Sequence, residues 1–309
     1  MRRAQLLRVA RAVFVLVALA CAWWGFRGRW SEIGEALAGT APLRLAGAVA
    51  LAALGLALTG WLWRTLLGCV GSDVGALDAA AVFFVGQLGK YVPGSVWSVA
   101  VQAHLGRRHE VPARSSLAAS AVFLLVHTAT GLLLGGALLA VSGPGQVPVA
   151  YAVLGAVVGG VALAPPLVRR LATRLAGRPT RFGTAELAAT TSLMAAGWML
   201  YGCSLLLLVP AGPGTPGLVG ATAAFALAHA VGVLVVLAPA GVGAREGVLV
   251  ALLAPALGVP GAAAVALLSR LAHALADFSV AALAAGAARA ARSTSPDAEA
   301  AEPARAGGR

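Results

Sequence analysis

Long apolar runs, separated by short polar segments, dominate the chain. Six of these runs are long enough to cross the ~30 Å hydrocarbon core of a bilayer at ~1.5 Å per helical residue. Tryptophans near the ends of the first two runs are typical of the aromatic belt at a membrane surface, namely Trp23, Trp24, Trp30, Trp61 and Trp63. We therefore predict an all-α polytopic membrane protein whose full spans lie near residues 10–26, 45–67, 116–141, 148–168, 186–209 and 261–287.

Two further apolar regions are broken at their centres. Region 76–105 is split at Lys90-Tyr-Val-Pro-Gly94, and its arms of about 13 and 11 residues reach only ~16–20 Å, roughly the middle of a bilayer. Region 218–260 is interrupted by Pro239-Ala-Gly-Val-Gly-Ala-Arg-Glu246. Its first arm would extend about 31 Å and could cross fully. We predict two broken or re-entrant helical hairpins, and the sequence leaves open whether the second is a pair of ordinary spans.

The charges in the loops predict the orientation of these segments. Arginines gather before the first and third spans, after the fourth and after the last, whereas 142–147 and 210–217 carry no charge. Cytoplasmic loops of membrane proteins are enriched in Lys and Arg. A first hairpin that enters from the cytoplasm and returns there satisfies this bias, and the second hairpin then opens outside. Both termini are expected in the cytoplasm; Arg27 and Arg29 are the exceptions to the pattern.

Composition supports the membrane assignment and excludes several classes of protein. Hydrophobic residues make up 60% of the 309 residues, charged residues only 11%, and the mean hydropathy is +0.87. The net charge of +12 comes from loop arginines rather than a basic stripe with interleaved aromatics, so no nucleic-acid partner is expected. Three scattered cysteines suggest neither disulfides nor a metal site. We expect one transmembrane domain over 1–290 and a disordered cytoplasmic tail over 291–309.

The two broken regions resemble one another. In the first, a phenylalanine and a glutamine four residues apart precede Pro-Gly, and a Val-Pro pair then leads into a span that contains a histidine. The second has the same order with histidine in place of glutamine. The matched positions are Phe83 and Phe225, Gln87 and His229, Pro93-Gly94 and Pro239-Ala-Gly241, Val111-Pro112 and Val259-Pro260, and His127 and His273. With the opposite orientations inferred from charge, this pattern predicts an inverted repeat, from which many transporters build a midplane site.

Ionisable residues inside the membrane are the candidates for function. Lys90 is the only lysine in the chain, and it lies too deep in its hairpin for easy snorkelling to the headgroups. Arg245 and Glu246 occupy the break of the second hairpin; they could pair with each other, or Glu246 could stabilise the first turn of the returning helix. Both breaks precede expected helix starts, at Ser95 and near Ala244. Helix N-termini beside a lysine or arginine suit a phosphate group.

The final span carries a polar face. Ser269, Arg270, His273 and Asp277 are offset so that they share one side of a helix. A self-satisfied His273–Asp277 pair and a role in a site, with Asp277 and His273 as proton carriers, both remain open. His127 and His229 are expected to form interhelical hydrogen bonds. No catalytic carboxylate pair, metal-binding cluster, phosphate-binding loop or nucleophile elbow is present in the sequence, so neither an enzyme nor a cofactor is expected.

Two motifs together resemble a known family. Gly86-Gln-Leu-Gly-Lys-Tyr-Val-Pro-Gly94 followed by Pro239-Ala-Gly-Val-Gly-Ala-Arg-Glu246 is similar to the transmembrane domain of the lysylphosphatidylglycerol synthase/flippase family. The resemblance covers the chain to about residue 290 and implies two inverted re-entrant hairpins. For bifunctional members it implies translocation of an aminoacylated phospholipid. Their soluble aminoacyl-transferring domain is missing from this sequence, so synthesis of lysyl lipid is not expected; stand-alone relatives are thought to handle other lipids, including polyprenyl-phosphate-linked sugars.

These inferences combine into one hypothesis and one rival. The hypothesis is a multi-pass flippase of the cell membrane that moves a phospholipid or a polyprenyl-phosphate-linked lipid through a midplane site for its anionic headgroup. The rival is a non-transporting accessory protein that binds a lipid or a lipid-modifying enzyme. The lipid, the direction, the coupling ion and whether the chain forms a homo-oligomer stay open. The predicted substrate-binding residues are Lys90, Pro93, Gly94, Ser95, Gly241, Gly243, Arg245, Glu246, Arg270, His273 and Asp277.

Overall fold

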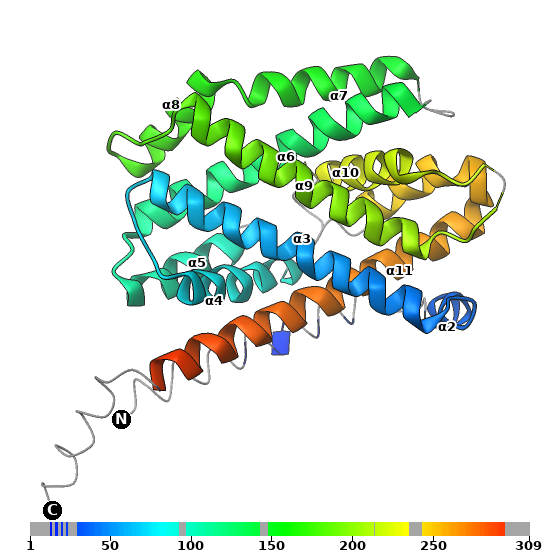
Figure 1. Ribbon diagram of the computed structural model, residues 1–309, viewed down its shortest axis with the longest axis horizontal. Coiled ribbons are helices and arrows are strands. Elements are labelled where there is room, and N and C mark those ends of the chain that lie inside the picture. The colour runs from blue at the N-terminus through cyan, green and yellow to red at the C-terminus, as the bar shows by residue number, and fades with distance from the viewer. Residues whose placement is uncertain are drawn as a thin grey trace, which may run out of the picture.

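The computed structural model describes residues 13, 16–17, 20, 23, 30–92, 97–142, 148–212, 214–234 and 243–293. Every regular element within these residues is a helix (Figure 1). In chain order the helices are α2 (Trp30–Ala38), α3 (Pro42–Cys69), α4 (Ala76–Gln87), the 3₁₀ helix η1 (Leu88–Tyr91), α5 (Trp97–Gly106), the 3₁₀ helix η2 (Arg107–His109), α6 (Ala113–Ser142), α7 (Val149–Ala162), α8 (Pro165–Ala176), α9 (Thr184–Leu208), α10 (Leu218–Leu234) and α11 (Ala244–Ser293).

Four helices are long and apolar enough to cross a membrane: α3, α6, α9 and α11. They coincide with the spans predicted near 45–67, 116–141, 186–209 and 261–287, which confirms a multi-pass helical membrane protein. The span predicted at 10–26 lies mostly outside the described residues, as does the tail beyond Ser293.

The predicted span 148–168 is not a single straight helix. The structure has α7 over 14 residues and then α8, bent by 54° from it, so the pair forms at most one broken span. The bend follows from Pro165 and Pro166, because a residue that precedes proline is disfavoured in helical conformation. α8 is amphipathic: its alanines and Val168 pack inward, while Arg169, Arg170 and Arg174 are exposed. Loss of continuous apolar character at these arginines ends the span early.

The first hairpin folds back on itself. Asp78, in the first turn of α4, accepts a hydrogen bond from Arg292 Nη1 at 2.7 Å and lies 3.5 Å from His109 Nδ1 in η2. The start of α4 and the end of α5 therefore meet at one end of the molecule, where α11 also ends (Figure 1). The chain therefore reverses direction between α4 and α5, so that region 76–105 is a hairpin.

The second hairpin consists of α10 and the first part of α11. α10 has 17 residues and belongs with the shorter apolar helices rather than with the full spans. The returning arm ends at Gly258, whose φ of 68° breaks α11 between Pro255 and Pro260. α10 and this arm lie at the end of the molecule that holds α2 and the start of α3, opposite the end where α4 and α5 open (Figure 1). The two hairpins thus open at opposite ends.

A buried polar chain ties the first hairpin to the spans beside it. Trp63 on α3 donates its indole N–H to Ser120 Oγ on α6 at 3.1 Å, and Ser120 donates to Gln102 Oε1 on α5 at 2.6 Å. Trp63 is only 1% exposed. Its assignment to a surface aromatic belt was therefore wrong; Trp61, which is 59% exposed, fits that role. The difference arises because the two tryptophans, two positions apart, face opposite sides of the helix.

Candidate functional site

The charged side chains buried in the described part of the chain form one cluster. Arg245, Glu246, Arg270 and Asp277 are each 6–8% exposed, and Lys90 joins them through an ion pair with Asp277. Lys90 comes from η1 at the turn of the first hairpin, Arg245 and Glu246 from the start of the returning arm of the second, and the other two from the final span. The tips of both hairpins therefore meet the polar face of α11.

Lys90 is held by the final span. Its Nζ lies 2.6 Å from Asp277 Oδ2, and the Tyr91 hydroxyl donates to the same oxygen at 2.7 Å. The Tyr91 ring stacks on Phe278 with 5.3 Å between centroids. The Lys90 side chain is 32% exposed and that of Asp277 is 5% exposed, so Lys90 is the more accessible member of the pair. Lys90 is thus directed into the bundle, and the snorkelling alternative does not describe it.

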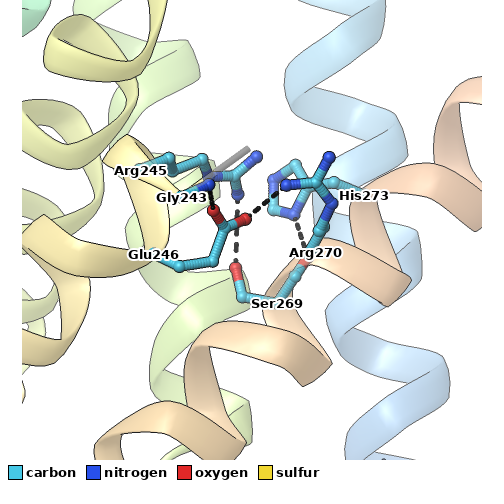
Figure 2. A network of polar contacts seen from close by, with 6 residues as sticks. All are labelled: Gly243, Arg245, Glu246, Ser269, Arg270 and His273. Carbon is cyan, nitrogen blue, oxygen red and sulfur yellow. Dashed lines mark hydrogen bonds and ion pairs between the residues drawn. The ribbon is translucent and has the colours of Figure 1, made fainter. Parts of the chain in front are cut away.

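Glu246 bridges the start and the second half of α11. Its Oε1 accepts from Arg270 Nη1 at 2.5 Å, and its Oε2 accepts the Gly243 N–H at 2.7 Å (Figure 2). Gly243 has φ of 86°, a conformation that glycine adopts without a steric penalty. The carboxylate therefore caps the helix start, as expected for an acidic residue in a first turn. The alternative in which Glu246 simply pairs with Arg245 is not what the structure has.

Arg245 has a different environment from the other two cations. Its Nη2 lies 3.4 Å from Ser269 Oγ (Figure 2), and its guanidinium carbon lies 4.7 Å from the centroid of the Phe225 ring. Among the described residues, no carboxylate lies within 4 Å of it. A hydroxyl and an aromatic face are weak compensation for a charge that is 92% buried. This guanidinium is the part of the cluster best suited to an external anion.

His273 does not form the pair with Asp277 that was one of the two alternatives left open by the sequence. Its Nδ1 lies 2.8 Å from the Ser269 carbonyl oxygen and must therefore carry the proton, since a carbonyl only accepts (Figure 2). Its Nε2 is buried and has no hydrogen-bond partner among the described residues. The ring stacks on Phe225 at 4.7 Å. The Asp277 carboxylate instead forms an ion pair with Lys90 and accepts a hydrogen bond from Tyr91, and both residues belong to the first hairpin, which is far from Asp277 in sequence.

Two further histidines, His127 and His229, lie beside this cluster. The rings of His127 and His229 are 5.0 Å apart, and both contact Trp198, at 4.6 and 5.4 Å between centroids. They belong to an aromatic group that joins α6, α9 and α10, and no hydrogen bond between helices involves them in the described residues. Within those residues, no group of three or more His, Cys, Asp or Glu side chains is arranged to hold a metal ion.

The structure brings most of the predicted site residues together. Lys90 pairs with Asp277, and separate polar contacts hold Gly243, Arg245, Glu246, Arg270 and His273, which come from the same helix as Asp277 or from its first turn. Pro93, Gly94, Ser95 and Gly241 lie outside the described residues. Two contributors were missed, Tyr91 and Phe225. Their only sequence signals were the position beside the lone lysine and the phenylalanine shared by the two broken regions.

The arrangement is chemically suited to holding an anion. Glu246 already accepts the Gly243 N–H at the start of α11, so the Arg245 guanidinium is the group there that has no anionic partner within 4 Å among the described residues. The partly exposed Lys90 supplies a second cation from the opposite hairpin.

Comparison with known families agrees with the two motifs. The chain matches the family model described as the lysylphosphatidylglycerol synthase TM region over residues 10–281. The matched region contains both hairpins and every residue of the buried cluster. No curated protein matches the chain.

Proposed function

Because the chain belongs to the lysylphosphatidylglycerol synthase transmembrane-region family, we propose that it is a lipid flippase that moves a lipid with an anionic headgroup between leaflets. The lipid tail would stay in the bilayer while the phosphate passes through the region between the two hairpin tips. Arg245 and Lys90 would hold the phosphate; Glu246, Asp277 and His273 would set the charge around it. The proposal is for a transporter, and not for an enzyme.

One observation carries the proposal: Arg245 is buried without a carboxylate partner among the described residues. A charge at the centre of a bilayer costs about 2.5–3.5 kcal/mol on insertion scales, so an uncompensated one is expected only where it has a use. An arginine that served only to join helices would be expected to face a carboxylate, as Arg270 does.

The opposite openings of the hairpins support alternating access. A midplane site between two broken segments of inverted orientation can face one leaflet and then the other when one half of the protein moves against the other half. We place the end that holds Asp78, His109 and Arg292 in the cytoplasm, where the exposed arginines of α8 would also attract anionic lipids by ~1 kcal/mol each.

Transport of a fluorescent phospholipid between the leaflets of proteoliposomes tests the proposal. Hydrogen bonds to charged groups contribute about 1.5–3 kcal/mol, so the Arg245→Ala variant should transport roughly tenfold to hundredfold more slowly than the wild type. Lys90→Ala should also be slower. Arg292→Ala is the matched control. Arg292 lies near the C-terminal end of α11, its side chain is 55% exposed, and it pairs with Asp78 of α4. This variant should transport at the wild-type rate.

The same measurement separates the rival functions. A wild-type protein that moves no lipid, while it keeps its melting temperature and binds lipid, would favour a non-transporting accessory role. Normal transport by both Arg245→Ala and Lys90→Ala would show that the phosphate site is wrong.

A further inference from the structure

The charge balance of the buried cluster points to the class of headgroup. We propose that the substrate carries one negative charge, on a single phosphodiester, and that phosphomonoester and pyrophosphate lipids are poor substrates. This inference rests on the proposed function and narrows its substrate, because a phospholipid and a polyprenyl pyrophosphate differ in charge.

Counted over the part of the chain that the structure describes, the cluster has one more cation than it has anions. Its cations are Lys90, Arg245 and Arg270, and its carboxylates are Glu246 and Asp277, which leaves a formal charge of +1 when the nearby imidazoles are neutral. The stretches that adjoin the hairpin residues in sequence, 93–96 and 235–242, contain no charged residue.

The extra charge is located on Arg245. Lys90 is 2.6 Å from Asp277, and Arg270 is 2.5 Å from Glu246, so each of these pairs is already neutral. Arg245 contacts a serine hydroxyl and an aromatic ring, and neither carries a charge. A guanidinium matches the two free oxygens of a phosphodiester, with two parallel hydrogen bonds.

Because the cluster is buried, the charge of the ligand must closely balance the net charge of the cluster. A net charge that remains in a region of low dielectric is costly, so the bound state is most stable when the ligand brings the charge to zero. A phosphodiester carries one negative charge, whereas a phosphomonoester carries about −1.5 to −2 at pH 7. A dianion could displace Asp277 from Lys90, but the displaced carboxylate is 5% exposed and stays in the cluster, so the excess negative charge would remain.

The test compares lipids that differ in headgroup charge. Wild-type protein in proteoliposomes is given fluorescent phosphatidylglycerol with one negative charge, zwitterionic phosphatidylethanolamine, phosphatidic acid as the monoester, and a polyprenyl pyrophosphate. Retention of the same lipids by the purified protein is measured in parallel by native mass spectrometry. Phosphatidylglycerol should be preferred over phosphatidic acid by about tenfold or more, which corresponds to about 1.4 kcal/mol.

Charge variants make the test independent of any one side chain. Asp277→Asn raises the formal charge to +2 and keeps an acceptor for Tyr91, so the preference should shift toward phosphatidic acid. Arg245→Gln lowers the charge to zero and should abolish the preference for phosphatidylglycerol over phosphatidylethanolamine. The double variant restores +1 and should recover the preference for one negative charge, which a merely structural role of either residue would not produce. Asp78→Asn is the matched control, the same substitution at a surface ion pair.

The outcomes separate the two proposals. Equal transport of monoester and diester lipids by the wild type, or an unchanged preference in Asp277→Asn, overturns the charge match and leaves the transport proposal standing. Selective retention of the diester without transport of any lipid overturns transport and keeps the charge match.

Discussion

The two buried arginines of α11 differ in what compensates their charge. Arg270 faces the Glu246 carboxylate at 2.5 Å, whereas Arg245 faces a hydroxyl and a ring. The two buried arginines of α11, which lie on either side of the break at Gly258, therefore differ in function. Arg270 fixes the second half of α11 against the start of the returning arm, and Arg245 remains available to an anion.

The Glu246–Arg270 pair makes a prediction about stability. Removing one partner of a buried ion pair leaves an uncompensated charge and costs about 3–5 kcal/mol. Glu246→Gln should lower the free energy of unfolding by that amount, because the amide keeps an acceptor for Gly243 but loses the charge. The measurement is denaturant unfolding in detergent micelles.

A surface pair of similar geometry is the control for this prediction. Asp78 and Arg292 lie 2.7 Å apart but are 30% and 55% exposed. Exposed ion pairs contribute about 0–1 kcal/mol, so Asp78→Asn should have little effect. Equal losses in Asp78→Asn and Glu246→Gln would mean that the buried pair does not hold α11 in its kinked arrangement.

At the scale of elements, the first hairpin depends on a close approach of its two arms. A Cβ atom added to Gly89 in η1 would lie 2.6 Å from the backbone nitrogen of Ser98 and 2.8 Å from the carbonyl carbon of Trp97. Backbone atoms cannot move aside as the end of a flexible side chain can. Gly89 is therefore required where the chain reverses, directly beside Lys90.

The Gly89→Ala variant should separate the arms of the hairpin. Overpacking costs about 1–3 kcal/mol, and the displacement would move Lys90 away from Asp277, so both stability and lipid transport should fall. Gly286→Ala on α11 is the control: its Cβ would meet no atom within 4 Å. That variant should be neutral or more stable by about 0.5–1 kcal/mol. The two variants are compared by their melting temperature in detergent and by their rate of lipid flipping. A Gly89→Ala variant with the wild-type melting temperature and flipping rate would contradict the close-packed hairpin.

The sequence predicts the elements of this fold better than it predicts their partners. Run length locates the four long spans and the first hairpin, and spacing places His273 and Asp277 on one face. The Lys90–Asp277 pair joins residues that lie far apart in sequence, and local periodicity carries no information about such a contact. The bend before Pro165 was missed because mean hydropathy across 148–168 outweighs a local break. Trp63 was misassigned because its position near a helix end does not reveal which side it faces.

At the scale of the whole molecule, the two hairpins approach one another from opposite ends and meet at the charged cluster. The arginine-rich end holds Asp78, His109 and Arg292, and the segment 210–217 at the other end has no charge. Among the described residues, the buried charged side chains of both hairpins lie in one cluster, and such a cluster suits a site that opens toward either end in turn.

Labelling of single cysteines tests this arrangement in cells. Cys21, Cys69 and Cys203 are first replaced by serine, and one cysteine is introduced at Arg108 in η2 or at Ala211 between α9 and α10, both of which are exposed. Because cytoplasmic loops are enriched in arginine, an impermeant maleimide added outside intact cells should label Ala211→Cys and not Arg108→Cys. Both should react after permeabilisation. Labelling of Arg108→Cys from outside would invert the orientation, and labelling of both positions from the same side would contradict hairpins that open at opposite faces.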